Sequence, residues 1–247
     1  MVAHALNNEA LINQVHVWYL DPDAEVGSSS LDRFFGMLSA PEQAQYQRFH
    51  FPEDAHRYLV SHAMLRCALS RYAAIDPAAL AFRPARHGKP AITNPGLHAL
   101  KFNLTHTAGL AACVVTLDDD CGIDAEKISA RHNPVGVAGR MFSVEEKKEL
   151  NRLQGEEQLD YFYSRWTLRE AYVKARGIGL SFPTHKLCFR VDSAADIDLT
   201  FDASVDDNGE NWMINLWRPG PQHIAAIAVA RRSDTRKQLV VRRLELT

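Results

Sequence analysis

Residues 121–126 read Cys-Gly-Ile-Asp-Ala-Glu, and this stretch decides how the middle of the chain folds. Side chains alternate between the two faces of a β-strand, so Asp124 and Glu126 are expected on one face, with Ile123 and Ala125 facing the core. Two neighbouring carboxylates repel each other unless a cation lies between them. Oxygen ligands of this kind suit Mg²⁺, which completes its coordination with water and phosphate. An exposed strand edge with two solvated acids remains the alternative interpretation.

A second stretch, residues 166–174, reads Trp-Thr-Leu-Arg-Glu-Ala-Tyr-Val-Lys and falls in a helix expected over 158–175. Trp166, Glu170 and Lys174 are spaced four residues apart, so they share one face of that helix. The functional interpretation is that Glu170 binds the metal and Lys174 binds a phosphate. The alternative is an ordinary surface Glu–Lys pair beneath a partly buried tryptophan.

Other groups suited to phosphate lie earlier in the chain. The strand-like stretch 102–107 contains Thr105 and His106, a hydroxyl followed by an imidazole. Lys89 adds a cation on a rigid turn before Pro90, and Arg57 adds a guanidinium near the start of a helix. Each feature is common by itself. Together with a metal site they indicate a polyanionic ligand, most simply a pyrophosphate.

The pattern of strands and helices predicts an α+β fold. A first part contains a strand, a long helix and two further strands, and a second part contains helices followed by strands. Strands are expected at 15–20, 102–106, 110–117, 121–128, 187–191, 197–201, 212–217 and 224–230, and long helices at 55–72 and 158–175. A capping box is expected at Ser143–Glu146 and a left-handed helix end at Gly177. Solvated hairpin turns are expected at Asp118–Asp120 and at Asn208-Gly209.

Composition excludes several classes of protein. The 247 residues contain 28 basic and 30 acidic side chains, a balance that does not favour nucleic-acid binding. The four cysteines form no C-x-x-C pair and are expected to be reduced thiols. Neither a signal peptide nor a membrane-spanning segment is evident, so a cytoplasmic protein without a membrane partner is expected.

Three blocks in this sequence resemble the larger, Sfp-type class of 4′-phosphopantetheinyl transferases. They are Phe-Asn-Leu-Thr-His-Thr at 102–107, Gly-Ile-Asp-Ala-Glu at 122–126 and the helical stretch 166–174, and they occur in the expected order. The match departs from the usual pattern at Thr105 and Thr107, where serines are common, and at Arg169, where lysine is common.

The resemblance implies two similar α+β halves related by a pseudo-twofold axis, acting as a monomer. Residues 1–118 would form the N-terminal half, which binds the nucleotide end of coenzyme A, and residues 119–247 the C-terminal half, which carries the metal ligands and the catalytic helix. No sequence repeat between the halves is evident. The implied residues are Arg57, Lys89, Pro90, Thr105, His106 and Lys174 for coenzyme A, and Asp124, Glu126 and Glu170 for Mg²⁺.

The implied reaction transfers the 4′-phosphopantetheine arm of coenzyme A to a serine of an apo acyl or peptidyl carrier protein. Glu170 is the hypothesised base and Lys174 the group that neutralises charge on the departing phosphate; a metal-bound hydroxide is the rival base. A metal-dependent nucleotide phosphodiesterase or pyrophosphatase is the alternative enzyme, and a non-catalytic nucleotide-binding module is the third hypothesis. The basic residues between Arg231 and Arg243 are expected to form a solvated tail, with a carrier-docking surface as the alternative.

Overall fold

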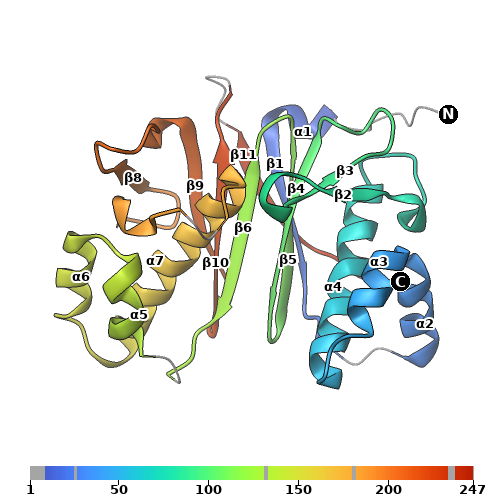
Figure 1. Ribbon diagram of the computed structural model, residues 1–247, viewed down its shortest axis with the longest axis horizontal. Helices are drawn as coiled ribbons and strands as arrows, with labels where there is room; N and C mark the ends of the chain where they lie inside the picture. Colours follow the sequence, from blue (N-terminus) through green and yellow to red (C-terminus); the bar gives the residue numbers. More distant parts are fainter. Residues whose placement is uncertain (1–8, 25–26, 131–132, 180–181, 233–236, 247) are drawn as a thin grey trace. The chain divides into compact units, whose positions relative to one another are not determined.

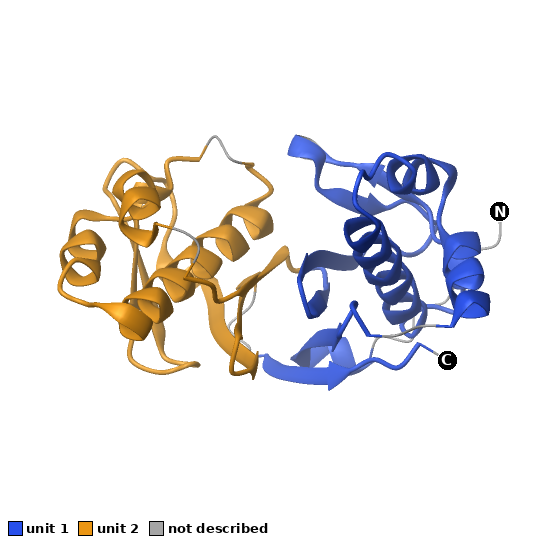
Figure 2. Cartoon of the chain, turned by 90° about the horizontal axis from the view of Figure 1, so that it is seen from below, with its two compact units in different colours: residues 1–118, 235–247 blue, residues 119–234 orange. Residues whose placement is uncertain are grey.

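The protein is described by a computed structural model that covers residues 9–24, 27–130, 133–179, 182–232 and 237–246. The chain divides into two compact units, residues 1–118 with 235–247 and residues 119–234, coloured blue and orange in Figure 2. Helices and sheets occur in both units, which confirms the expected α+β fold class.

The first unit is built on a sheet with the strand order β11-β1-β5-β4. Strand β1 pairs with β11 in parallel and with β5 antiparallel, and β5 pairs antiparallel with β4. Leu59, Ala63 and Met64 of the long helix α4 are buried in its core. The elements, labelled in Figure 1, are α1 (Glu9–Asn13), β1 (Gln14–Leu20), α2 (Ser28–Met37), α3 (Ala40–Tyr46), α4 (Pro52–Ser70), η1 (Pro77–Ala79), β2 (Phe82–Pro84), η2 (Arg86–Gly88), β3 (Pro90–Ile92), β4 (Leu100–Thr107), β5 (Leu110–Leu117) and β11 (Gln238–Arg243).

The second unit is built on the antiparallel sheet β6-β10-β9, and the long helix α7 lies across one face of it (Figure 1). Leu168 and Tyr172 of α7 pack with Ala226 of β10 in the core. The elements are β6 (Cys121–Lys127), α5 (Pro134–Met141), α6 (Val144–Leu150), α7 (Gly155–Arg176), η3 (Thr184–Lys186), β7 (Leu187–Val191), β8 (Ile197–Phe201), η4 (Gly209–Asn211), β9 (Trp212–Gly220) and β10 (His223–Ala230).

Both units repeat one order of elements: a strand, helices ending in a long helix, a short strand pair and then two antiparallel strands. In each unit a serine is the N-cap of a short helix and forms a capping box with a glutamate. That glutamate also forms an ion pair with a buried arginine on the long helix. These residues are Ser39, Glu42 and Arg66 in the first unit, and Ser143, Glu146 and Arg169 in the second.

Local signals in the sequence predicted many of these elements correctly. Strands expected at 110–117, 187–191 and 197–201 coincide with β5, β7 and β8. The capping box of Ser143 is confirmed, and α7 ends at Gly177 with a left-handed φ of 59°. A helix end of this kind satisfies terminal carbonyls that would otherwise lack partners.

Two expected hairpin turns are wrong. Asn208-Gly209 leads into η4, where the Asn208 side chain accepts from the amide of Glu210 over 3.1 Å, and β8 pairs with β7 whereas β9 pairs with β10. Asp118–Asp120 connects β5 and β6, which belong to different sheets, and Asp119 is buried. Turn residues specify a local bend, whereas strand pairing is decided by distant segments.

The C-terminal segment also differs from the expectation. Residues 119–247 were expected to form one half, but β11 pairs with β1, so residues 235–247 belong to the first unit. The expected solvated tail is correct for exposure, because Arg231, Arg232, Arg242 and Arg243 are exposed. It is wrong for structure, because Arg242 and Arg243 lie on β11, and the Arg242 guanidinium is 5.6 Å from the Trp18 ring centroid. Residues 233–236 of that basic segment lie outside the described part of the chain.

Two further expectations can be compared with the structure. The four cysteines Cys67, Cys113, Cys121 and Cys188 are free thiols, as expected. Within the described ranges, none of the helices combines the length and apolar character needed to cross a bilayer.

Candidate functional site

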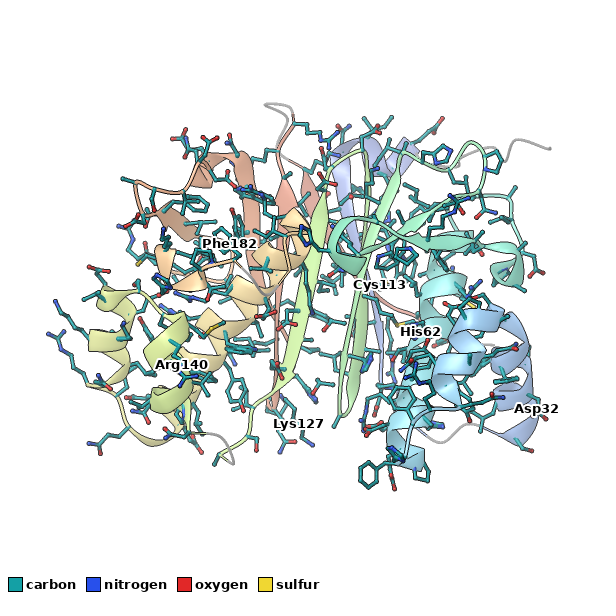
Figure 3. All side chains as sticks on the ribbon, in the orientation of Figure 1. Asp32, His62, Cys113, Lys127, Arg140 and Phe182 are labelled. Carbon is teal, nitrogen blue, oxygen red and sulfur yellow. The ribbon has the colours of Figure 1, made fainter. Side chains whose placement is uncertain are left out.

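A close approach between β6 and α7 positions the acidic side chains. A Cβ atom built on Gly122 of β6 would lie 2.1 Å from the carbonyl oxygen of Ala171 and 2.4 Å from the amide nitrogen of Ala175. Only glycine therefore allows this distance between strand and helix. Asp124 follows on the same strand, which ends at Lys127, labelled in Figure 3.

Lys174 and Asp124 form an ion pair between the helix and the strand. The Lys174 Nζ atom donates to Asp124 Oδ1 over 2.6 Å and to the carbonyl oxygen of Ile123 over 3.3 Å. The Asp124 side chain is 8% exposed. Its second oxygen, Oδ2, is buried and has no hydrogen-bond partner among the described residues. A buried carboxylate oxygen that lacks a donor is destabilising, so Oδ2 is an acceptor suited to a cation.

Glu126 is the second acid on β6, and its environment favours the protonated form. The Trp166 indole Nε1 donates to Glu126 Oε1 over 3.1 Å, which fixes one carboxylate oxygen. Burial, with repulsion from Asp124 next in size, raises the pKa of Glu126 to about 7. A nearby cation would relieve both effects, because it favours the ionised carboxylate.

Glu170 on α7 is electrostatically coupled to Asp124. Burial raises the pKa of Glu170, and repulsion from Asp124 adds to the effect, while attraction from Lys174 opposes it. The surface Glu170–Lys174 pair considered from the sequence is therefore not the main contact of the lysine, which donates to Asp124 instead. Because repulsion from Asp124 adds to the rise in the pKa of both Glu126 and Glu170, the three carboxylates form one electrostatic cluster.

The carboxylates of Asp124, Glu126 and Glu170 suit a hard divalent cation, although they do not form a complete coordination site by themselves. In the ranges that the structure describes, no three His, Cys, Asp or Glu side chains already stand together as a metal site. Mg²⁺ needs few protein ligands, since water and substrate phosphate supply the remainder. Carboxylate chemistry, the unpartnered Asp124 Oδ2 and the raised pKa values of Glu126 and Glu170 agree with such an ion. The assignment of these three residues as ligands stays a prediction.

Arg169, next to Glu170 in the sequence, anchors the helix. Its buried guanidinium pairs with Glu146 and donates to the carbonyl oxygens of Met141 and Leu187 over 3.0 Å each. A guanidinium has the fixed array of donors that this set of acceptors requires, whereas lysine has a single ammonium group. The arginine at this position therefore serves packing around α7.

The remaining predicted residues lie in the first unit. Thr105 and His106 are near the end of β4, where Thr105 is buried and His106 is exposed, as expected for neighbours on a strand. Lys89 and Pro90 lie at the start of β3, and Arg57 is in the second turn of α4. Their roles toward coenzyme A stay predictions, as does a ligand shared with the acids of the second unit.

Sequence reasoning missed two contacts at these sites. Trp166 was placed on the face of Glu170 and Lys174, but its hydrogen bond to Glu126 requires β6 to lie beside α7. Asp23, in the loop after β1, pairs with Arg57 at 3.1 Å and carried no signal beyond a turn-rich composition. Both contacts join segments far apart in the chain, which local spacing does not reveal.

Comparison with known proteins identifies the family of this chain. The model of the 4′-phosphopantetheinyl transferase superfamily matches residues 120–228, and that of the 4′-phosphopantetheinyl transferase N-terminal region matches residues 27–117. A 4′-phosphopantetheinyl transferase of Bacillus subtilis, ffp, is 31% identical over 85% of this chain and 89% of its own length. The HetI transferase of Nostoc is 32% identical over 71% and 73%, and another Bacillus subtilis transferase is 29% identical over 86% and 90%. The chain therefore belongs to the 4′-phosphopantetheinyl transferase superfamily.

Proposed function

We propose that this transferase moves the 4′-phosphopantetheine arm of coenzyme A to a serine hydroxyl of an apo carrier protein, with Mg²⁺ as cofactor. Membership of the family supports the reaction. The observation that carries the proposed metal dependence is the acid cluster. Its Asp124 Oδ2 atom is buried without a partner among the described residues, and burial, with repulsion from Asp124 next, raises the pKa of both glutamates. Acceptors are acyl or peptidyl carrier proteins.

Asp124, Glu126 and Glu170 are the proposed ligands of Mg²⁺. When bound, the ion supplies positive charge that offsets the negative charge of the coenzyme A diphosphate. Three carboxylates outweigh the charge of one Mg²⁺, so the diphosphate needs further cations. Lys174, which donates to Asp124, is the cation closest to the proposed ligands in the described contacts. Its ammonium group would neutralise charge on the departing phosphate.

The proposed reaction forms one bond and breaks one. The serine oxygen of the carrier protein bonds to the β-phosphorus of coenzyme A, the bond from that phosphorus to the bridging oxygen breaks, and 3′,5′-adenosine bisphosphate leaves. The serine proton goes to the carboxylate of Glu170, directly or through a water. Proper placement of the groups supplies most of the rate enhancement in transfers of this type.

The first unit would bind the nucleotide end of coenzyme A. Thr105 and His106 on β4, with Lys89 just before β3, offer hydroxyl, imidazole and ammonium groups for the 3′-phosphate and the adenine, and Pro90 begins β3 beside Lys89. Arg57 on α4, whose guanidinium pairs with Asp23, is proposed for the same end of coenzyme A.

Transfer should be detected directly by the mass of the product. Purified apo acyl and peptidyl carrier proteins, incubated with this protein, coenzyme A and Mg²⁺, should gain one phosphopantetheine group each when they are substrates. Chelation of the metal should stop the reaction, and added Mg²⁺ should restore it. Release of adenosine bisphosphate without any acceptor, and no modified carrier, would instead identify a hydrolase.

The Glu170→Gln variant should lose the acidic limb of the pH–rate profile. A base must be ionised, so activity should fall as pH decreases through the pKa of Glu170, which burial and Asp124 hold above the usual value for glutamate. Glu157→Gln, the same change at an exposed residue in the first turn of α7, is the matched control and should keep the limb. An unchanged limb in Glu170→Gln, with Mg²⁺ affinity retained, would assign the proton to another acceptor.

A further inference from the structure

Helix α7 is held by its neighbours at two positions, and Glu170 lies between them. Toward β6, the carbonyl oxygen of Ala171 lies only 2.1 Å from the place that a Cβ on Gly122 would occupy, so strand and helix are in close contact. One residue before Glu170, the side chain of Arg169 is buried and pairs with Glu146. Successive side chains of a helix point about 100° apart, so the two anchors together fix the direction of the side chain between them.

The Arg169 guanidinium joins α7 to three other elements of the second unit. Its Nε atom donates to the carbonyl oxygen of Met141 at the end of α5 over 3.0 Å. Its Nη2 atom donates to Glu146 of α6 and, over 3.0 Å, to the carbonyl oxygen of Leu187 at the start of β7. The ring centroid of Phe142 lies 4.3 Å from its Cζ atom. A rotation or shift of α7 would disturb several of these contacts at once.

Glu146 is equally constrained. Its Oε2 atom accepts from the amide of Ser143 over 2.9 Å as well as from Arg169, and its Oε1 atom accepts from the amide of Phe189 on β7 over 3.0 Å. The Glu146 side chain is 2% exposed. A buried carboxylate that accepts from three separate donors cannot follow a moving guanidinium, so the ion pair fixes α7 relative to α6 and β7.

The first unit contains the same ion pair without an acid beside it. Arg66 on α4 pairs with Glu42 of a capping box, as Arg169 does on α7 with the glutamate of its own unit. The next residue along the helix is Cys67 on α4 but Glu170 on α7. The pair therefore belongs to the folding of both units, and only in the second unit can it also direct a carboxylate. Comparison of the two pairs separates stability from positioning.

We propose that Arg169 and Glu146 are positioning residues for the metal site, which hold Glu170 in the direction from which it binds Mg²⁺. The inference rests on the proposed function, since it needs Glu170 to be a ligand of that ion. Arg169 and Glu146 act through the backbone of α7 and do not themselves contact metal or substrate. Loss of the pair should therefore weaken Mg²⁺ binding even in molecules that remain folded.

The test compares Arg169→Met with Arg66→Met, which removes the corresponding guanidinium from the first unit. Mg²⁺ is titrated by calorimetry without coenzyme A, at a temperature at which circular dichroism shows both variants folded. Arg169→Met should bind Mg²⁺ about tenfold more weakly than the natural protein, and Arg66→Met should stay within about twofold. Loss of a positive charge by itself would favour a cation, so weaker binding in Arg169→Met cannot arise from long-range electrostatics.

Arg169→Lys tests rescue, because lysine keeps the positive charge beside Glu146. Its Mg²⁺ affinity should return to within about threefold of that of the natural protein. Equal losses of affinity in Arg169→Met and Arg66→Met would overturn the proposal, as would no loss in Arg169→Met or an Arg169→Lys variant as weak as Arg169→Met.

A second matched pair applies even if the methionine variants do not fold. Glu146→Asp and Glu42→Asp keep the charge of each ion pair and shorten one side chain by a methylene. Glu146→Asp should lower both Mg²⁺ affinity and kcat by about threefold, with KM for coenzyme A within about twofold, while Glu42→Asp should leave Mg²⁺ affinity unchanged. Natural Mg²⁺ affinity in folded Glu146→Asp would overturn the proposal.

Failure of this inference and failure of the proposed function give different results. If the natural protein bound no Mg²⁺ and modified no carrier, the proposed function would fail, and the positioning role would fail with it. If the natural protein bound Mg²⁺ and modified carriers while the variants of the second unit matched those of the first in Mg²⁺ affinity, only the positioning role would be overturned.

Discussion

The Asp124→Asn variant should transfer phosphopantetheine at least about 10³-fold more slowly than the natural protein. Asp124 contacts Lys174 through Oδ1 and leaves Oδ2 buried without a partner among the described residues. An amide of the same size removes the negative charge that both Lys174 and a cation require. The ion pair and the proposed metal ligand are lost together, so the effect should exceed that of removing either one.

The loss should appear in metal binding as well as in rate. Calorimetric titration should show Mg²⁺ affinity reduced at least about tenfold in Asp124→Asn, in line with loss of a carboxylate ligand. Asp120→Asn is the matched control, because the Asp120 side chain forms an exposed ion pair with Arg232 at 3.2 Å, and such pairs contribute little. Asp124→Asn with natural transfer rate and Mg²⁺ affinity would remove Asp124 from the proposed site.

Much of the second unit could be predicted because its signals are local. Alternation along a strand places Asp124 and Glu126 two residues apart on one face, and both take part in the acid cluster. The helical period places Trp166 and Lys174 on one face of α7, from which they donate to Glu126 and Asp124. In both cases a short repeat in the sequence determines the direction of a side chain.

Contacts between distant segments could not be predicted in the same way. Strand β11 joins β1 by parallel pairing, which depends on a partner more than two hundred residues away in the chain. Lys174 contacts Asp124 instead of Glu170, its neighbour on the helix, because β6 lies beside α7. Local periodicity predicts the faces of one helix or strand at a time, and it does not predict which helices and strands contact each other.

The internal repeat was present in the sequence but was too sparse to be seen. The long helices of the two units both contain a Leu-Arg pair: Leu65-Arg66 on α4 and Leu168-Arg169 on α7. The structure shows that the two pairs correspond, because each arginine forms an ion pair with the glutamate of a capping box in the same unit. At the next position Cys67 corresponds to Glu170, so the first unit lacks the acid that the second unit places on its helix.

The Gly122→Ala variant should destabilise the second unit and reduce transfer beyond what the loss of stability explains. The added Cβ would meet two backbone positions of α7, Ala171 at 2.1 Å and Ala175 at 2.4 Å, and backbone atoms cannot turn aside as a flexible side chain can. Relief of that overlap requires β6 to move from α7, at a destabilisation of about 2–3 kcal/mol. The same movement would separate Asp124 from Lys174.

Gly139→Ala is the matched control, because Gly139 lies on the exposed face of α5 and a Cβ there would meet nothing within 4 Å. Alanine in a helix interior should stabilise it by about 0.5–1 kcal/mol. Hydrogen exchange of α7 amides reports the stability of the unit, and the transfer rate per folded molecule reports the geometry of the acids. Gly122→Ala with normal exchange and normal rate would mean that the spacing between strand and helix is not what sets the site. A normal rate with faster exchange would show that the acids tolerate the shift, whereas loss of rate with little loss of stability would trace transfer to the distance between β6 and α7.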